Sequence, residues 1–317
     1  MKLGLIGIGK VGSQILTDIQ YQNLFSEIVV IDTNEKLARG EVLDHQHAQG
    51  FDDSNHVKIS AGDYHDLSDA AVIIVTASTP MNAMMPDRVL LAEENGKLMA
   101  DLMQRIARAT QEAVIIFISN PVDAMTYIAS TTVNYPKHQI MGTGTLLESA
   151  RFKTLIANHY GIDPKSVHAF VIGEHGKNAV PVWSKVTIFG MPIKEFESLM
   201  KCEPIDQASI TAQIDKVAFD VLQQKGWTNT AISKAAVALT RHIVLDERTI
   251  LPVTALLDGD YGTDACAMSL PTLVTREGIE YRFPIELSET EQSAVNEAIS
   301  YIPVSYTHLT LPTSDLV

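Results

Sequence analysis

Three things are scarce in this sequence, and each scarcity excludes a class of protein. Cysteine occurs twice in 317 residues, at Cys202 and Cys266, so neither a disulfide framework nor a cysteine-based metal site is expected. Lysine and arginine number 24 against 38 aspartates and glutamates, and the net charge of −14 is a poor match to nucleic-acid binding. The apolar runs are too short to span a membrane, and no signal peptide precedes the first of them. These shortages favour a cytoplasmic protein without a metal and without nucleic-acid or membrane partners.

Apolar side chains are plentiful, at 46 % of residues, and in the first half of the chain they follow a repeating order. Short, almost continuous apolar runs alternate with longer helical stretches. This alternation is typical of a doubly wound parallel sheet of the α/β class. The expected strands cover residues 3–6, 28–31, 57–60, 71–76, 113–118 and 139–141, and the expected helices cover 13–22, 34–49 and 87–110.

The turn after the first strand carries the pattern Gly7-x-Gly9-x-x-Gly12, and the second strand ends at Asp32. A strand, this glycine pattern, a helix, a second strand and an acidic residue about 20 positions on form the fingerprint of dinucleotide binding. Its glycines permit a tight turn, a close approach to the pyrophosphate and close packing of helix on strand. A carboxylate at Asp32 accepts ribose hydroxyls and repels a 2′-phosphate, so NAD is favoured over NADP. The expected cofactor contacts are Gly7, Gly9, Lys10, Val11, Gly12 and Asp32.

Two polar segments, Thr76-Ala77-Ser78 and Ser119-Asn120-Pro121, follow the carboxyl ends of predicted strands. Ligands of such sheets bind at that edge, so Thr76, Ala77, Ser78 and Asn120 are expected beside the cofactor. A methionine-rich loop at residues 79–86 then leads to Arg88. We interpret this loop as a lid that carries Arg88 into the site, although exposed methionines also occur as ordinary packing residues.

In the second half, the apolar pair Val171-Ile172 runs into the turn Gly173-Glu174-His175-Gly176. A histidine between two glycines at the end of a strand is expected to be exposed to a cleft, and its ordinary pKa of about 6.5 suits proton transfer. A lone histidine on a turn is more often a simple surface residue. Glu148 and Arg151 stand three positions apart on one helix face, which by itself predicts an ion pair on a solvated surface.

The remainder of the second half mixes helices and strands. Residues 225–228 break one helix and cap the next, which is expected to end near residue 245, and residues 251–283 are rich in strand signals. Ser288 and Glu291 form a capping box for a final helix. We predict that this helix stops at Pro303, because residues 304–317 show no helical period.

Taken together, these motifs resemble the L-lactate/malate dehydrogenase family, on the side of the L-lactate and L-2-hydroxyisocaproate dehydrogenases. The resemblance covers residues 1 to about 302 and implies a Rossmann NAD-binding domain at 1–142 and an α+β catalytic domain at 143–303. Residues 304–317 are then an atypical tail that does not belong to the family. The motifs are the glycine pattern with Asp32, the Arg88 loop, Asn120-Pro121-Val122-Asp123, Gly142-Thr-Gly-Thr, Glu148-x-x-Arg151, Gly173-Glu-His-Gly and Gly226-Trp-Thr228.

The resemblance implies a role for each residue that it matches. His175 exchanges the proton of the reaction, and Glu148 matches the carboxylate, usually an aspartate, that orients this histidine. Arg151 grips the substrate carboxylate with a bidentate fork, and Arg88 polarises the substrate carbonyl.

The other implied contacts concern the substrate and the assembly. Asn120 hydrogen-bonds the substrate oxygen, Thr228 lines the side-chain pocket, and Asn82 takes the place of the glutamine of lactate enzymes, in a loop about one residue longer than theirs. A homotetramer or a dimer is implied. A weak fructose 1,6-bisphosphate effector site is implied at Lys153 and His168, since Lys153 replaces an arginine; the alternative is that both are ordinary surface residues.

The resemblance leaves the substrate open among 2-oxo acids. Residues 79–87 contain no lysine or arginine to meet a second carboxylate, and Asp87 repels one, so oxaloacetate is expected to be rejected. Pyruvate, and hence L-lactate dehydrogenase activity, is the first expectation. An L-2-hydroxyisocaproate dehydrogenase is the alternative, and a malate dehydrogenase is third. Two other classes are weighed. An inactive NAD-binding protein is expected to lack some of the catalytic residues, whereas Arg88, Arg151, Asn120 and His175 are all present. An NAD-dependent glycosidase needs a metal-binding set that includes a cysteine near the nicotinamide, and neither cysteine lies in one of these motifs.

Overall fold

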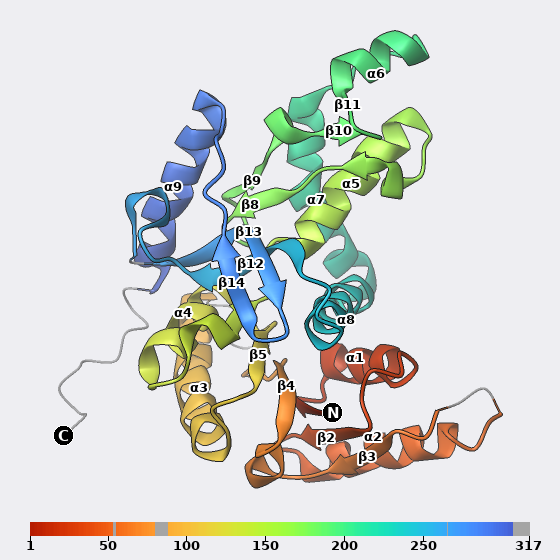
Figure 1. Cartoon of the computed structure of the whole chain (residues 1–317), viewed down its shortest axis with the longest axis vertical. Coiled ribbons are helices and arrows are strands. Elements are labelled where there is room, and N and C mark those ends of the chain that lie inside the picture. Colours follow the sequence, from red (N-terminus) through yellow and green to blue (C-terminus); the bar gives the residue numbers. More distant parts are fainter. Residues whose placement is uncertain (53–54, 80–87, 265, 307–317) are drawn as a thin grey trace.

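A computed structural model of the chain describes residues 1–52, 55–79, 88–264 and 266–306, with the backbone alone at 88–91 and 303–306. Asn82 and most of the predicted tail therefore lie outside the described residues. The first half of the chain forms the lower part of the molecule in Figure 1 and the second half most of the upper part. The elements of the first half are β1 (Lys2–Ile6), α1 (Lys10–Gln20), β2 (Glu27–Ile31), α2 (Glu35–Ala48), β3 (Lys58–Ala61), β4 (Ala70–Val75), α3 (Arg88–Ala109), β5 (Val114–Phe117), α4 (Val122–Thr132) and β6 (Ile140–Gly142).

The first-half strands pair in the order β3-β2-β1-β4-β5-β6, and every one of these pairs is parallel. This confirms the predicted doubly wound parallel sheet. Alternate residues of each strand face opposite sides of the sheet, and most are apolar; β1, β2 and β3 begin with the charged residues Lys2, Glu27 and Lys58. In β5, Ile115 and Phe117 pack with α3 and α4, whereas Val114 and Ile116 pack with α1 and α2.

The second half combines helices with shorter, antiparallel strands. The end of β6 pairs with β12 at Gly142 and Thr254, so the sheet continues without a break into the second half, through β13, β8 and β9. The elements of this half are α5 (Leu146–Tyr160), β7 (Val167–His168), β8 (Val171–Gly173), β9 (Ala179–Pro181), β10 (Thr187–Ile188), β11 (Met191–Pro192), α6 (Ile193–Met200), α7 (Gln207–Lys225), α8 (Thr230–Val244), β12 (Thr249–Leu256), β13 (Ala267–Thr275), β14 (Gly278–Arg282) and α9 (Glu289–Tyr306).

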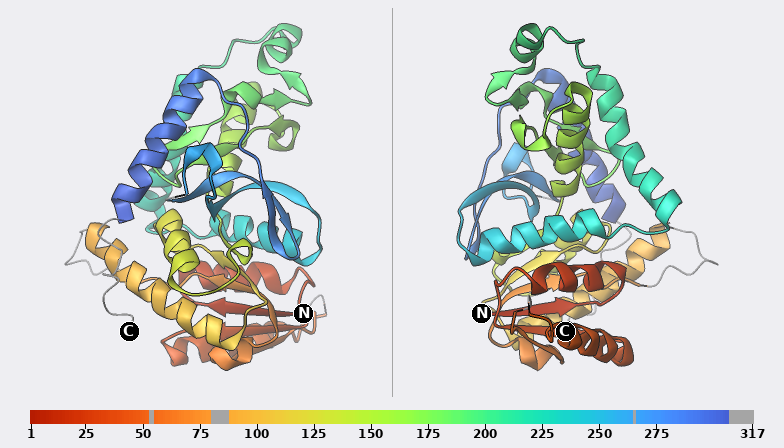
Figure 2. Two further views of the ribbon diagram at one scale, coloured as in Figure 1. Left: turned by 60° about the vertical axis from the view of Figure 1, so that its left-hand side comes forward. Right: turned by 90° about the vertical axis from the view of Figure 1, so that its right-hand side faces the viewer.

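Helix α8 belongs to the second half by sequence but covers the sheet of the first. It lies along α1 in the right-hand view of Figure 2, and its Val237 and Ile243 join the core that α1 and α2 form on that sheet face. Two hydrogen bonds fix the pair of helices: Asn229 Nδ2 donates to Gln14 Oε1 at 3.2 Å, and Ser233 Oγ donates to Asp18 Oδ2 at 2.5 Å. The start of α8 is thereby held beside the middle and the later part of α1.

The last helix begins as predicted but does not end where it was predicted to. The capping box is present, since Ser288 N donates to Glu291 Oε2 at 2.9 Å and Glu291 N donates to Ser288 Oγ at 3.4 Å. The prediction that the helix stops at Pro303 is wrong, because the α9 backbone continues to Tyr306. A proline lacks one N–H, but its φ suits a helix, and the three residues after it complete less than one turn. Within the described residues, no helix combines the length and apolarity needed to cross a membrane.

Candidate active site

The glycine turn between β1 and α1 is closely packed at two glycines and open at the third. Gly7 has φ +94°, and a Cβ there would lie 2.6 Å from the backbone nitrogen of Ala77; a Cβ at Gly12 would lie 2.1 Å from the carbonyl oxygen of Gly7. A Cβ at Gly9 would meet no described atom within 4 Å. Gly7 and Gly12 therefore hold strand, turn and helix together, while the open space at Gly9 and the start of α1 suits a pyrophosphate.

Asp32 stands at the end of β2, next to this turn. Its Oδ2 accepts the backbone N–H of Ile8 at 2.7 Å, and its Oδ1 accepts that of Asn34 at 2.8 Å. Each carboxylate oxygen has a further lone pair, so the fixed carboxylate can still accept ribose hydroxyls. The glycine turn and Asp32 together fit the adenosine and pyrophosphate of NAD.

Asn95 connects the segments that follow β4 and β5, and sequence reasoning missed it. It lies on α3 and is 1 % exposed. Its Oδ1 accepts the N–H of Thr79 at 2.7 Å and its Nδ2 donates to the carbonyl of Asn120 at 2.8 Å; its amide also contacts Ser78 Oγ. Asn95 thus fixes two of the predicted cofactor contacts relative to each other. An asparagine inside a helix is a weak signal, because such residues usually point to solvent.

The remaining predicted cofactor contacts also meet at the glycine turn. Thr76 Oγ1 donates to the carbonyl of Gly7 at 2.9 Å, and the backbone N–H of Ala77 donates to the carbonyl of Ile6 at 3.1 Å. Lys10 lies at the start of α1 with Val11 beside it. The structure thus brings the predicted cofactor contacts from β1, β2, β4 and β5 to one edge of the sheet.

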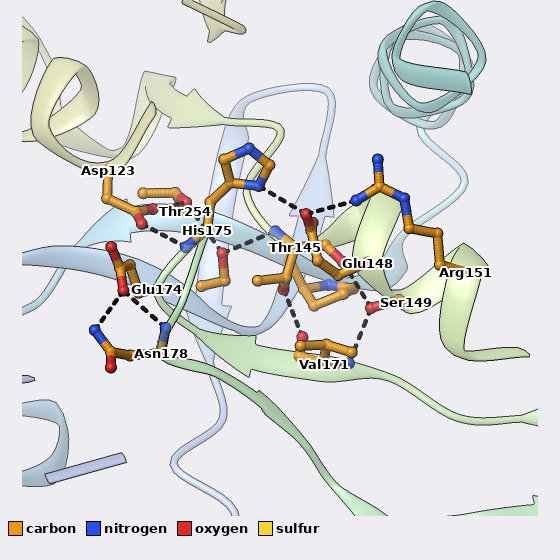
Figure 3. A network of polar contacts seen from close by, with 12 residues as sticks. Asp123, Thr145, Glu148, Ser149, Arg151, Val171, Glu174, His175, Asn178 and Thr254 are labelled. Atoms are coloured by element: carbon orange, nitrogen blue, oxygen red, sulfur yellow. Dashed lines mark hydrogen bonds and ion pairs between the residues drawn. The ribbon is translucent and has the colours of Figure 1, made fainter. Parts of the chain in front are cut away.

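His175, Glu148 and Arg151 form one contact group (Figure 3). Glu148 Oε1 lies 3.2 Å from His175 Nδ1 and 3.2 Å from Arg151 Nη1. The two side chains from α5 are 6 % and 15 % exposed, so the ion pair expected on a solvated surface is instead buried in the site. The His175 side chain is 22 % exposed, less than its position on a turn predicted, and Glu148 lies against its ring.

The contact between the Glu148 carboxylate and the His175 ring is close but imperfectly aligned. The Glu148–His175 contact has ion-pair distance without hydrogen-bond alignment, and Glu148 Oε2 is buried with no hydrogen-bond partner in the described part of the chain. Among the described contacts of Arg151, only Nη1 is engaged, by Glu148. Its other guanidinium nitrogens remain available for a substrate carboxylate.

The charges around His175 hold it protonated at neutral pH. Burial lowers the pKa of the imidazole, but the Glu148 carboxylate, and behind it Asp123, outweigh burial and raise the pKa to about 9. Burial likewise disfavours ionisation of Glu148, yet His175 and Arg151 lower the pKa of its carboxyl below its ordinary value. A protonated histidine next to an ionised glutamate is the state required to donate a proton to a developing alkoxide.

The other predicted site residues are placed less completely. Arg88 begins α3, but its side chain, like the whole of Asn82, lies outside what the structure describes. Thr228 is half-buried two residues before α8, which the Asn229–Gln14 contact fixes against α1. Thr228 is therefore anchored next to the helix that begins at the glycine turn.

Two features of the described residues bear on metal binding. Within the described residues, one cluster of potential metal ligands occurs, Asp63, His65 and Asp66. It lies at a short 3-10 helix (Tyr64–Leu67), where Asp63 and Asp66 form a capping box, which explains their proximity. Cys266 is fully buried, and burial, with the charge of Asp123, raises the pKa of its thiol to about 12. The cluster of Asp63, His65 and Asp66 contains no cysteine, which the glycosidase alternative requires among its metal ligands.

Comparison with known proteins decides the family. Residues 1–142 match the NAD binding domain of lactate/malate dehydrogenases, and residues 145–302 match the alpha/beta C-terminal domain of the same enzymes. The chain belongs to the lactate/malate dehydrogenase family. It is an NAD-dependent oxidoreductase of 2-hydroxy acids, and its cofactor is NAD.

Individual relatives agree over nearly the whole chain. The chain is 38 % identical to L-lactate dehydrogenase 2 of Clostridium acetobutylicum, over 94 % of this chain and 93 % of that protein, and 38 % identical to L-lactate dehydrogenase of Selenomonas ruminantium, over 94 % of each. Among solved structures, minor L-lactate dehydrogenase from Enterococcus mundtii, in a ligand-bound form, gives a TM-score of 0.92 at 27 % identity and covers 98 % of this chain and 99 % of its own. Lactate dehydrogenase from Cryptosporidium parvum, complexed with lactic acid and nicotinamide adenine dinucleotide, gives 0.91 at 27 % identity and covers 98 % of both chains.

Proposed function

We propose that this chain is an L-lactate dehydrogenase, which interconverts pyruvate and NADH with L-lactate and NAD. The observation that carries the proposal is the sharing of Glu148 Oε1 between His175 and Arg151 at 3.2 Å each. One carboxylate thereby sets the distance between a proton donor and a carboxylate-binding cation. In a 2-oxo acid the carbonyl carbon is bonded directly to the carboxylate carbon. The proton donor for the carbonyl oxygen and the cation for the carboxylate must therefore lie close together.

In this proposal His175 is the acid and base of the reaction. Its Nδ1 faces Glu148, which leaves Nε2 to give its proton to the substrate oxygen in reduction and to take it back in oxidation. Glu148 orients the ring and stabilises the imidazolium, as carboxylates do in other histidine pairs. Bound NADH supplies the hydride that the carbonyl carbon receives.

The substrate contacts in the proposal follow from charge and position. Arg151 binds the substrate carboxylate through the guanidinium nitrogens that Glu148 leaves free. Asn120, which Asn95 fixes by its carbonyl, hydrogen-bonds the substrate oxygen. Thr228 borders the substrate's methyl group. We assign Arg88 to polarisation of the carbonyl and Asn82 to a polar contact from the loop, on the family resemblance alone.

A panel of 2-oxo acids tests the proposal. We expect kcat/KM with NADH to be highest for pyruvate, lower but measurable for 2-oxoisocaproate, and lowest for oxaloacetate. A buried second carboxylate without a cation costs several kcal/mol, on the order of a thousandfold in kcat/KM. If 2-oxoisocaproate is preferred, the alternative of an L-2-hydroxyisocaproate dehydrogenase replaces the proposal. A preference for oxaloacetate indicates a malate dehydrogenase and refutes our interpretation of the loop.

The family resemblance also bears on the oligomeric state, the cellular location and the domain bounds of the protein. We infer a homo-oligomer, a tetramer or a dimer, in the cytoplasm, with domains at 1–142 and 143–303 and a non-native tail at 304–317.

Lys153 and His168 lie on the neighbouring elements α5 and β7 and form the proposed weak fructose 1,6-bisphosphate site. Burial lowers the pKa of Lys153, and lysine binds phosphate as a point charge, so any activation is small. Pyruvate saturation curves with and without the bisphosphate test this site, and sedimentation velocity tests the assembly.

A further inference from the structure

A second carboxylate contacts the catalytic turn from the opposite side to Glu148. Asp123, on α4, is 4 % exposed, and its Oδ2 accepts the backbone N–H of His175 at 2.7 Å (Figure 3). The contact bridges the two halves of the chain, since the residues are 52 positions apart. Asp123 is therefore the one side chain described here as hydrogen-bonding the backbone of His175 itself.

The other oxygen of Asp123 is fixed by a buried chain of hydroxyls. Thr254 Oγ1, on β12, donates to Asp123 Oδ1 at 2.5 Å and lies 3.0 Å from Ser269 Oγ on β13. Ser269 Oγ in turn accepts the backbone N–H of Thr145 at 3.0 Å, at the start of the helix that carries Glu148 and Arg151. Thr254 and Ser269 are fully buried, so the carboxylate has little freedom to turn.

Glycines make room for this chain of contacts. A Cβ at Gly144 would lie 2.2 Å from Ser269 Oγ and 2.6 Å from the backbone nitrogen of Thr254. A Cβ at Gly142 would lie 2.6 Å from Thr126 Oγ1 and 3.2 Å from the Cβ of Thr254. The Gly-Thr-Gly-Thr segment thus lets β12 approach α4 closely enough for Thr254 to reach Asp123.

We propose that Asp123 is a positioning residue for His175: its carboxylate fixes the backbone of the catalytic turn and supplies a second negative charge that stabilises the imidazolium. The proposal rests on the acid and base role of His175 given above. Two opposite constraints then place the imidazole, Glu148 at the ring and Asp123 at the backbone.

The charges near His175 are consistent with this division. Glu148 and Arg151 face it from α5, Asp123 faces it from α4, Glu174 belongs to its own turn, and Asp215 of α7 interacts with it at longer range. Burial raises the pKa of Asp123 to about 6, while the Thr254 hydroxyl and His175 oppose that rise. The Thr254 hydroxyl and His175 thus favour the ionised form of Asp123, which is the form that attracts an imidazolium.

Asp123→Asn removes the charge and retains the shape. The amide oxygen can still accept the N–H of His175, and the amide nitrogen can donate to Thr254 Oγ1, whose own proton can turn to Ser269. We expect NADH affinity to stay unchanged, kcat/KM for pyruvate to fall about 10-fold or more, and the pKa of His175 to fall by about 0.5–1 unit. The pKa is read from the alkaline limb of the kcat/KM profile and, without turnover, from an NMR titration of labelled histidine assigned with His175→Asn.

Glu174→Gln is the matched control. Glu174 carries the same charge one residue from His175, but its carboxylate turns away to accept the backbone and side-chain N–H groups of Asn178, at 3.0 and 2.6 Å. We expect Glu174→Gln to change neither the activity nor the pKa of His175. A folded Asp123→Asn protein with the wild-type pKa of His175 overturns the proposal, and so does a Glu174→Gln protein with an equal shift.

A second variant pair covers the case in which Asp123→Asn does not fold. Thr254→Val removes the hydroxyl that holds Asp123, and Thr254→Ser keeps it. We expect Thr254→Val to lower kcat/KM for pyruvate with NADH affinity unchanged, and Thr254→Ser to restore it; equal activity of the two overturns the proposal. Wild-type turnover on the 2-oxo acid panel is measured first, so that failure of the proposed function is recognised separately from failure at Asp123.

Discussion

Lys10 Nζ lies 4.7 Å from the centre of the Trp227 ring, so a residue of the glycine turn contacts the residue before Thr228. Lys225 approaches the same ring at 5.9 Å. The indole is 39 % exposed, which keeps each cation–π contact modest. These cation–π contacts add to the hydrogen bonds that connect α1 and α8, where the cofactor half of the chain meets the substrate half.

This relationship gives a prediction about stability. We expect Lys10→Met to lower the free energy of unfolding by about 0.5–1 kcal/mol, the usual range for an exposed cation–π pair. In a double-mutant cycle with Trp227→Leu, the loss at Lys10 should vanish once the ring is absent. Urea denaturation of the wild type, the two single variants and the double variant measures it. Strictly additive losses mean that the contact contributes nothing.

The first half of the fold could be predicted from sequence because its strands, except β3 at the edge, are largely buried on both faces. Each of the six predicted strands lies within about two residues of an observed one, since a continuous apolar run bounded by a turn has few other interpretations. The strands β7, β10 and β11 have two residues each, which is too short for any period to show. They were not predicted for that reason.

The site residues also divide into those that the sequence could identify and those that it could not. Gly7, Gly12, Asp32, Glu148, Arg151 and His175 belong to short local motifs, and the structure gathers them into two groups, one at the glycine turn and one around His175. Asp123 and Asn95 act through partners 52 and 25 positions away, so no local spacing identifies them. Asp123 is the last residue of the motif Asn120-Pro121-Val122-Asp123, and sequence reasoning assigned a role only to the first residue, Asn120.

Glu291 gives a prediction about acid stability. Burial opposes its ionisation, but hydrogen bonds from Ser184 and Ser288 lower the pKa of its carboxyl below the ordinary 4.5. Since the folded state favours the charged form, this stabilisation is present above pH 4.5 and is lost as pH falls through the lowered pKa. We expect Glu291→Gln to cost about 1–3 kcal/mol at neutral pH and less in acid.

Urea denaturation at neutral pH and near pH 3 measures the Glu291 effect, with the exposed Glu297→Gln as its control. A loss for Glu291→Gln that is the same at both pH values would contradict the linkage argument. An equal loss for Glu297→Gln would show that the effect belongs to net charge.

Asp32 gives a prediction about cofactor choice. We expect the wild type to prefer NADH over NADPH by at least about tenfold, because a charge-assisted hydrogen bond contributes about 1.5–3 kcal/mol and a 2′-phosphate meets a carboxylate. Asp32→Ser should narrow the gap, and Asp32→Asn, which keeps an acceptor for the N–H of Ile8, separates loss of charge from loosening of the glycine turn. The ratio of kcat/KM values for the two cofactors is the measurement. Equal wild-type values would refute the assignment.

His175→Asn gives a prediction about turnover. An asparagine can still be held by the Asp123 contact through its backbone N–H but cannot exchange a proton at this pH. We expect kcat for pyruvate reduction to fall by about 10²–10⁴-fold, the usual contribution of a general acid, with NADH affinity preserved. Stopped-flow single turnover and fluorescence titration with NADH measure the two quantities. Turnover within a few-fold of wild type would remove His175 from the reaction.

The pH dependence of the two directions follows from the raised pKa of His175. Reduction of pyruvate needs the protonated imidazole, and the pKa of about 9 means that this form dominates across neutral pH. We therefore expect kcat/KM for pyruvate to be constant between about pH 7 and 8 and to fall about tenfold per unit above the pKa. Oxidation of L-lactate needs the neutral imidazole, so its kcat/KM should rise over the same range and level off above the pKa.

Glu148→Gln separates this explanation from a general effect of alkali. Removal of the carboxylate that lies 3.2 Å from Nδ1 should move both limbs toward the ordinary histidine pKa, because burial then acts with less opposition. The limb for pyruvate reduction shifts to lower pH, and lactate oxidation becomes faster relative to reduction at neutral pH. The full pH profile in both directions, for wild type and Glu148→Gln, measures the shift. Limbs that stay in place in the variant would mean that a group other than His175 titrates there.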